Sequence, residues 1–377
     1  MFSPERHPRR PKMRGDLEFG TIPGLLAKAA ATHGDRLAVE DGARSLSFRG
    51  LQASVTRAAA ALRGRGIGRG DRVGIWAPNM PEWIVAALAV HTVGAAVVPL
   101  NTRYKGAEAR DILSRAGAKL LFTVDGFLGL DFRAMLDWPD LPTVVFRQDW
   151  DAFLAEGDGG DGAPAAEPDD VCDILFTSGT TGRPKGVPTT HAQSLRAFWD
   201  WSAVVGLRAD DRYLVVAPFF HAFGYKAGWL AALLRGATVL PQPTFDVDAV
   251  LARIPKDRVT MLPGPPALYQ TLLMRPDLGQ HDLSSLRLAV TGAASIPVQL
   301  IRDMRDVLGF ETVITGYGLT ECTGVVTMCR DGDDPETIAT TSGRAIPGVE
   351  VRIVGADGAA VPPGAAGEVE VRGYNVM

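Results

Sequence analysis

Short apolar runs alternate with longer stretches of helical periodicity along most of this chain. Runs that are typical of buried strands occupy residues 71–76, 95–99, 119–124, 171–176, 213–217 and 286–290. Stretches with helical character lie at residues 81–93 and 297–308. The strand, helix and strand within residues 71–99 form a β-α-β unit, the building block of a parallel sheet that helices cover on both faces. The pattern therefore predicts an α/β fold.

Three segments depart from this pattern. Residues 1–16 are basic and contain prolines but no apolar run, which predicts a disordered tail rather than a signal peptide. Residues 156–170 are rich in Gly, Asp, Pro and Ala, so they are expected to form a solvated loop. Short alternating strands with an Asp-Gly turn between them predict a small β-rich subdomain over residues 342–373.

Composition narrows the classes of partner. A chain of 377 residues exceeds what one core usually serves, so packed α/β subdomains are expected. The net charge of −4 provides no basic surface for nucleic acid, which leaves small molecules. Residues 83–100 are apolar but interrupted, so no transmembrane segment is predicted. An oligomer remains possible. The few cysteines are too irregularly spaced for a disulfide framework or a zinc site and indicate a cytoplasmic protein: Cys172, Cys322 and Cys329.

The strongest chemical signal follows the strand at residues 171–176. The chain there reads Thr-Ser-Gly-Thr-Thr-Gly-Arg-Pro-Lys-Gly, and its backbone N–H groups, hydroxyls and ammonium all donate hydrogen bonds to anionic oxygens, which predicts a polyphosphate-binding loop. It is not the usual P-loop, because no hydroxyl residue follows Lys185 to bind magnesium. The alternative is a flexible linker. The candidate nucleotide-binding residues are Thr177, Ser178, Gly179, Thr180, Thr181, Gly182 and Lys185.

A second cluster lies at residues 315–321, after a short strand-like run. Two glycines around a tyrosine allow its ring to lie flat against a planar ligand. Thr320 and Glu321 place a hydroxyl and a carboxylate side by side, where they suit a phosphate and a metal ion. The alternative is a surface turn with an incidental glutamate. The candidate ligand-binding residues are Gly316, Tyr317, Gly318, Thr320 and Glu321.

Both clusters resemble signatures of the adenylate-forming superfamily, which includes acyl-CoA synthetases, luciferases and peptide-synthetase adenylation domains. The resemblance implies that Tyr317 stacks on adenine, Thr320 contacts the α-phosphate and Glu321 holds Mg²⁺. Residues 292–294 match a third element, although Gly-Ala-Ala after a strand is also common in close packing. The residues of this third element, which would let the nucleotide and the acyl group approach the backbone, are Gly292, Ala293 and Ala294.

The aromatic segment at residues 219–225 matches a fourth element, which in the family forms a wall between the carboxylate and nucleotide sites. His221 is the candidate for orienting the reacting carboxylate; the alternative is a core histidine with satisfied hydrogen bonds. The expected acyl-site residues are Phe220, His221, Tyr225, Gly264 and Pro265. The catalytic candidates implied by the whole resemblance are Lys185, His221, Thr320 and Glu321.

The resemblance implies a ligase that uses ATP, Mg²⁺ and coenzyme A. The carboxylic acid is joined to the α-phosphate of ATP with loss of pyrophosphate, and CoA then displaces AMP from the acyl-adenylate. Such catalysis depends on positioning and charge neutralisation rather than on a protein nucleophile, and the chain shows no convincing nucleophile with a paired base. The alternative is a nucleotide- or acyl-binding module that has lost catalysis.

The resemblance covers residues 17–373, the large N-terminal AMP-binding domain of the family. Family members normally continue with a hinge and a small C-terminal lid domain, so we expect that domain to be absent and turnover to be impaired. Three segments are most similar to ligases of bacterial steroid catabolism that activate a propanoate side chain; they are residues 219–228, 262–266 and 327–330. A medium- or long-chain fatty acid is the alternative substrate.

Overall fold

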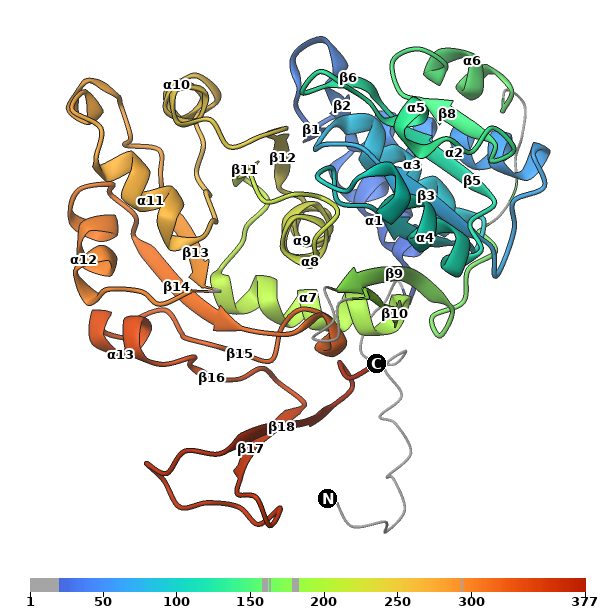
Figure 1. The fold of residues 1–377 in the computed structure, drawn as a ribbon. Coiled ribbons are helices and arrows are strands. Elements are labelled where there is room, and N and C mark those ends of the chain that lie inside the picture. Colours follow the sequence, from blue (N-terminus) through green and yellow to red (C-terminus); the bar gives the residue numbers. More distant parts are fainter. Residues whose placement is uncertain (1–19, 158–161, 163, 178–182, 293) are drawn as a thin grey trace.

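Two α/β units lie side by side, and a thin β-hairpin projects from the second (Figure 1). The computed structural model describes residues 20–157, 162, 164–177, 183–292 and 294–377. Buried apolar residues of both units belong to one continuous hydrophobic core. The predicted α/β class is therefore correct, and the two units share their interior rather than folding around separate cores.

A six-stranded sheet in the order β10-β9-β4-β3-β5-β8 forms the centre of the first unit. Its strands are β3 (Arg72–Trp76), β4 (Ala96–Pro99), β5 (Leu120–Thr123), β8 (Thr143–Val145), β9 (Val171–Thr177) and β10 (Lys185–Thr190). All neighbours pair in parallel except β10, which pairs antiparallel with β9 at the edge. The covering helices include α2 (Phe48–Gly64), α3 (Pro81–Thr92), α4 (Gly106–Ala116), α5 (Phe132–Leu136) and α6 (Trp150–Ala155).

The predicted β-α-β unit is present as β3, α3 and β4, with β3 and β4 paired in parallel. Every residue of α3 is buried, which explains why its sequence is apolar all round instead of carrying one apolar stripe. Pro81 occupies its first turn, where a missing N–H costs no hydrogen bond. Its one acidic residue, Glu82, is buried and forms an ion pair with Arg44.

The second unit is built on two four-stranded sheets, β11-β12-β1-β2 and β13-β14-β15-β16. Their strands are β1 (Leu37–Val39), β2 (Leu46–Ser47), β11 (Arg212–Val215), β12 (Thr238–Pro241), β13 (Leu288–Gly292), β14 (Thr312–Tyr317), β15 (Thr327–Met328) and β16 (Arg344–Ala345). Met261 joins the two sheets, because it forms parallel bridges to Tyr213 of β11 and to Leu288 of β13. Strands from both ends of the chain therefore share one extended β-structure.

Helices of varied length surround the second unit. They are α7 (His191–Val205), α9 (Ala231–Arg235), α10 (Val247–Asp257), α11 (Pro266–Leu273), α12 (Val298–Asp306) and α13 (Pro335–Thr340). Helix α1 (Ile22–His33) packs mainly against α2 and α3 of the first unit and also contacts α9. A short helix, α8 (Ala222–Gly224), continues into a π-helix over Tyr225–Leu230. Helix α7 begins at a capping box between Thr190 and Gln193 and ends at Gly206 in the left-handed conformation, which are the expected start and stop signals.

The region predicted as a small β-rich subdomain divides in two. Strand β16 joins the sheet of the second unit, whereas β17 (Val349–Val354) and β18 (Glu368–Gly373) form a separate antiparallel pair. This pair is the projecting hairpin of Figure 1. After it, Asn375 is buried, and its side-chain amide donates hydrogen bonds to the carbonyls of Cys322 and Val325. The last residues therefore pack against the second unit.

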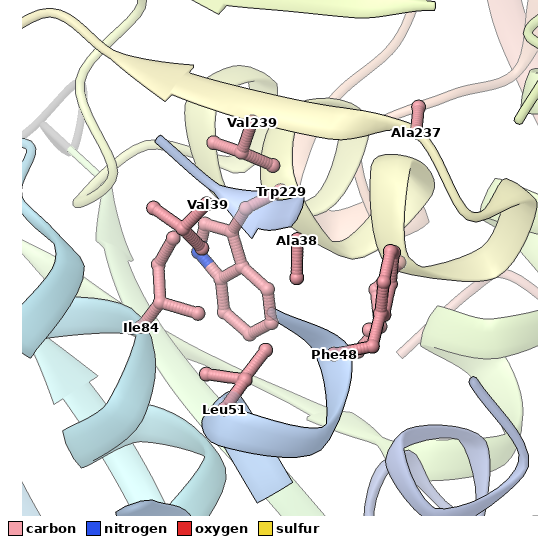
Figure 2. A pocket seen from close by; sticks show the side chains of 9 residues that line it. Ala38, Val39, Phe48, Leu51, Ile84, Trp229, Ala237 and Val239 are labelled. Atoms are coloured by element: carbon pink, nitrogen blue, oxygen red, sulfur yellow. The ribbon is translucent and has the colours of Figure 1, made fainter. Parts of the chain in front are cut away.

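A small apolar cavity lies where the two units meet. Figure 2 shows the side chains of Val39 and Trp229 from the second unit facing Leu51 and Ile84 from α2 and α3. None of the described residues that line this cavity is charged, so they offer nothing to bind a carboxylate or a phosphate, and we regard the cavity as a packing gap. Within the described part of the chain, no helix is long and apolar enough to cross a membrane.

Candidate active site

Strands β9 and β10 bring the two ends of the predicted phosphate loop together. Thr177 and Lys185 are directly opposed in the antiparallel register of these strands. Lys185 is exposed and is thus accessible to a ligand. The predicted nucleotide-binding residues between these two ends lie outside the described residues: Ser178, Gly179, Thr180, Thr181 and Gly182. Ala293, which belongs to the third element of the resemblance, also lies outside them.

Helix α4 holds both sides of this hairpin near its tip. Arg115 donates a hydrogen bond of 2.8 Å to the carbonyl of Pro184. The same guanidinium lies 5.5 Å from the centre of the Phe176 ring on β9. Asp111, one turn earlier, forms an ion pair with Arg183. Sequence reasoning missed Asp111 and Arg115, because their contacts join residues that are distant in the chain.

The predicted elements at residues 292–294 and 315–321 meet at the carboxyl ends of two parallel strands. Gly292 of β13 is in register with Gly316 of β14. Gly292 has a φ of 153°, and a Cβ atom there would lie 2.9 Å from the carbonyl oxygen of Gly316, so only glycine fits without strain. Tyr317 follows directly at the end of β14, half-buried, and Ala294 is exposed. This edge of a parallel sheet is where α/β folds usually bind ligands.

The turn after β14 carries Thr320 and Glu321 in a short 3₁₀-helix. Gly318 is required by close packing, because a Cβ atom there would lie 2.2 Å from the carbonyl oxygen of Gly324. A Cβ at Gly324 would in turn lie 3.1 Å from that of Ala222. The turn therefore packs directly beside the segment that carries His221.

Glu321 combines a fixed backbone with an available side chain. Its carbonyl accepts a hydrogen bond of 3.0 Å from the N–H of Met377. The residue is half-buried, and its carboxylate forms no ion pair or hydrogen bond with any described residue. A carboxylate without a protein partner suits Mg²⁺, which commonly takes one or two carboxylates and completes its shell with phosphate oxygens and water. The described residues contain no group of three or more His, Cys, Asp or Glu that would form an all-protein metal site.

Asn79 positions the aromatic segment before His221. Its side-chain amide donates hydrogen bonds to the carbonyls of Val215 and Ala217, at 3.0 and 2.9 Å. Its side-chain oxygen accepts a hydrogen bond of 2.7 Å from the N–H of Phe219. Sequence reasoning missed Asn79, although a polar residue just beyond the buried strand β3 was a visible signal.

His221 and Phe220 are placed at an accessible position. His221 is the N-cap of α8, and its Nδ1 accepts a hydrogen bond of 3.2 Å from the N–H of Phe223. Its imidazole is exposed to solvent, yet the surrounding protein atoms desolvate it partially and lower its pKa. The exposed ring and the half-buried Phe220 are both available to a ligand, so the core-histidine alternative is not supported.

Tyr225 differs from these neighbours. Its side chain is completely buried, its ring is stacked on Trp229 at 4.9 Å, and its hydroxyl is hydrogen bonded to Nε2 of His91 at 3.0 Å. A ring enclosed in this way presents no face to a substrate. We therefore do not include Tyr225 in the acyl site, although the sequence placed it there. Its aromatic type was the misleading signal, because aromatic residues serve cores as readily as ligand sites.

The Gly264-Pro265 turn lies beside β13. The N–H of Gly264 donates a hydrogen bond of 3.0 Å to the carbonyl of Val290, two residues before Gly292. Pro265 is exposed and is the N-cap of α11. The structure therefore brings this turn and the end of β13 together, which is the arrangement that the acyl-site prediction requires.

Comparisons with known proteins decide the family. The chain matches the model of the AMP-binding enzyme family over residues 26–377. This protein belongs to the AMP-binding enzyme family. It is 46% identical to a methyl-dioxo-octahydro-indenyl propanoyl:CoA ligase of Rhodococcus jostii (strain RHA1), covering 95% of this chain and 72% of that protein. It is 49% identical to the ligase of the same name from Mycobacterium tuberculosis (strain ATCC 25618 / H37Rv), covering 96% of this chain and 72% of that protein.

Solved structures of this family have the same fold. The crystal structure of anthranilate CoA ligase AuaEII in complex with anthranoyl-AMP matches with a TM-score of 0.88 at 27% identity, over 96% of this chain and 70% of that one. The inhibitor-bound N-terminal domain of FACL13 from Mycobacterium tuberculosis matches with a TM-score of 0.85 at 28% identity, over 94% of this chain and 89% of that one. The predicted family and the adenylate-forming fold are both confirmed.

Proposed function

We propose that this protein is an ATP-dependent carboxylic acid:CoA ligase that makes an acyl-adenylate and then an acyl-CoA thioester. The observation that carries the proposal is its 46% and 49% identity to two propanoyl:CoA ligases over nearly the whole chain. The convergence of Gly292, Gly316 and the turn bearing Glu321 beside His221 supports it, because a nucleotide and an acid must meet to react. The alternative of a pure binding module has no comparable support.

We assign the nucleotide roles to the residues that match the signatures of the family. Thr177 and Lys185, at the ends of the phosphate loop, donate hydrogen bonds to the phosphates, and Tyr317 stacks on adenine. Thr320 contacts the α-phosphate, and Glu321 is the carboxylate that would hold Mg²⁺. When bound, Mg²⁺ neutralises negative charge on the phosphate oxygens. Preorganised donors of this kind stabilise the charge that develops at the α-phosphorus.

The acid binds at the segment that carries His221, next to the nucleotide. His221 orients the carboxylate, which must approach the α-phosphorus in line, and proximity of this kind supplies much of the rate. Of the remaining acyl-site residues, Phe220 is half-buried and Pro265 is exposed, and both would contact the body of the acid, whereas Gly264 is buried. We propose a propanoate attached to a bicyclic ring system as the acid, as named for the two ligases. Free, buried cysteines fit a reducing compartment, so we place the enzyme in the cytoplasm.

ATP–pyrophosphate exchange with a panel of acids tests the proposal. The protein should exchange label in a Mg²⁺-dependent manner, fastest with a bicyclic propanoate, slower with octanoate and slowest with acetate. The Lys185→Met variant serves as the control for the phosphate site and should lose most of the exchange. Folded wild-type protein that exchanges with none of these acids would refute the ligase function, and a preference for octanoate would refute the proposed acid.

Binding of a stable mimic provides a second test that needs no turnover. An acyl-sulfamoyl adenosine carrying the bicyclic propanoyl group should raise the Tm more than the acetyl analogue, because it buries more apolar surface. Equal shifts in Tm for the two mimics would show that the ring system is not recognised.

A further inference from the structure

Asp173 and Lys226 form a completely buried ion pair. Asp173 Oδ2 and Lys226 Nζ are 3.1 Å apart, and both side chains are 0% exposed. Lys226 also donates a hydrogen bond of 2.5 Å to Oγ1 of Thr189, and that hydroxyl donates one of 2.6 Å to Oδ1 of Asp173. The two charged groups and the hydroxyl thus form a hydrogen-bond network. A buried ion pair needs such additional hydrogen bonds to offset the cost of its desolvation.

These three residues join separate parts of the proposed active site. Asp173 of β9 and Thr189 of β10 are register partners in the hairpin whose other end carries Thr177 and Lys185. Lys226 lies in the π-helix that follows α8, close in sequence to the carboxylate-orienting His221. The pair therefore connects the strands of the phosphate loop to the segment of the acyl site.

The π-helix itself is an irregular element of the kind often found at functional sites. Gly228, within it, has ψ of −106°, outside helical values. A Cβ atom at Gly228 would lie 3.0 Å from Val215 of β11, so the π-helix is packed closely against that strand. The π-helix therefore has little freedom to move together with the hairpin if the hairpin shifts.

Four other ionisable side chains lie near the pair: His91, His191, Cys172 and Tyr225. Burial lowers the pKa of His191 to about 4 and that of His91 well below its ordinary value, so both rings are neutral. Burial raises the pKa of Cys172, whose thiol lies 3.2 Å from Asp173, and that of Tyr225, so both remain protonated. Lys226 therefore has Asp173 as its charged partner in this network.

We propose that Asp173 and Lys226 are positioning residues that set the phosphate-loop hairpin and the carboxylate-orienting segment at reacting distance from each other. The inference rests on the proposed ligase function and deepens it. Stability alone does not account for the pair, because well-packed apolar replacements of buried ion pairs are often neutral or stabilising. A positioning role predicts that each substrate still binds without the pair, whereas their reaction becomes slow.

The test replaces both charges together with apolar side chains, in the variant Asp173→Leu/Lys226→Met. Binding of a non-hydrolysable ATP analogue and of the bicyclic propanoate is measured separately by calorimetry, and acyl-adenylate formation by single-turnover mass spectrometry. Each Kd should stay within about twofold of wild type, whereas the rate should fall by about 10- to 100-fold, because small misplacements carry penalties of that order.

A matched control replaces the ion pair between Arg69 and Asp170, which is partly exposed. Nη2 of Arg69 lies 2.8 Å from Oδ1 of Asp170, the residue just before β9. The variant Arg69→Gln/Asp170→Asn should leave both Kd values and the rate unchanged. If the buried double variant does not fold, Thr189→Val removes the bridging hydroxyl at nearly constant volume. It should slow the reaction by at least about threefold with unchanged Kd values, because it weakens the same connection.

Two results would overturn the positioning role. One is a wild-type rate in the folded double variant, or in Thr189→Val where the double variant is unfolded. The other is a loss of substrate affinity that accounts for the whole loss of rate, which would indicate general damage to the site. Wild-type protein that forms no acyl-adenylate would instead refute the proposed function, so the two failures are distinguishable.

Discussion

Replacing Asn79 by alanine should destabilise the protein strongly, because this one buried side chain forms several hydrogen bonds. The residue is 2% exposed and forms three hydrogen bonds to the backbone of residues 215–219. Each is worth about 1 kcal/mol net, so Asn79→Ala should lower the free energy of unfolding by about 3 kcal/mol. Loss of the bond to Phe219 should also loosen the segment that carries His221.

Urea unfolding followed by tryptophan fluorescence measures this effect. The control is Asn101→Ala, because that side-chain oxygen accepts a single hydrogen bond, from the exposed N–H of Arg103. The control should lose less than about 1 kcal/mol. A loss below about 1 kcal/mol for Asn79→Ala as well would refute the reasoning, because it would show that water replaces all three bonds.

Three further predictions concern acid stability, the metal and a turn. Burial lowers the pKa of His191 to about 4 from 6.5, so the unfolded state takes up the proton first as pH falls from 6.5 to 4. Stability should decline over that window, and His191→Gln should reduce the decline by at most about 3 kcal/mol in pH-dependent unfolding. Glu321→Gln should abolish the Mg²⁺ dependence of ATP binding in calorimetry without changing the Tm; an unchanged dependence would contradict the assignment. Gly318→Ala should lower the Tm measurably, because its Cβ would lie 2.2 Å from the carbonyl oxygen of Gly324, and an unaltered Tm would mean that the turn relaxes freely.

The elements that the sequence predicted well are those with strong local patterns. The runs at residues 119–124, 213–217 and 286–290 correspond to β5, β11 and β13, and the stretch at residues 297–308 corresponds to α12. The opening helices and strands α1, α2, β1 and β2 received no prediction. Helix α2 shows that a usable pattern was overlooked, because its buried Leu51, Val55 and Leu62 recur at helical spacing, although alanines and arginines lie between them.

The candidate site was predictable only where motifs are local. Glycines at residues 292, 316 and 318 stood out in the sequence, and the structure supplies a reason for each in a contact or a positive φ. Asn79, Asp111 and Lys226 did not stand out, because each acts on residues far away in the chain. Tyr225 was misassigned for the same reason, since only the fold shows which aromatic rings are enclosed.

The pairing of β1 with β12 has a consequence for how the protein is made. Val39 of β1 is the register partner of Val239, and among the strands that the structure describes β1 neighbours β12 and the two-residue β2. At roughly 5–20 residues per second, a ribosome needs about 10–40 s to synthesise the roughly 200 residues that separate these partners. Throughout that time the edge of β1 is an unpaired template on the nascent chain, open to the wrong strand. Synonymous codons that slow translation between β2 and β12 would lengthen this exposure and favour aggregation, even though the encoded protein is unchanged.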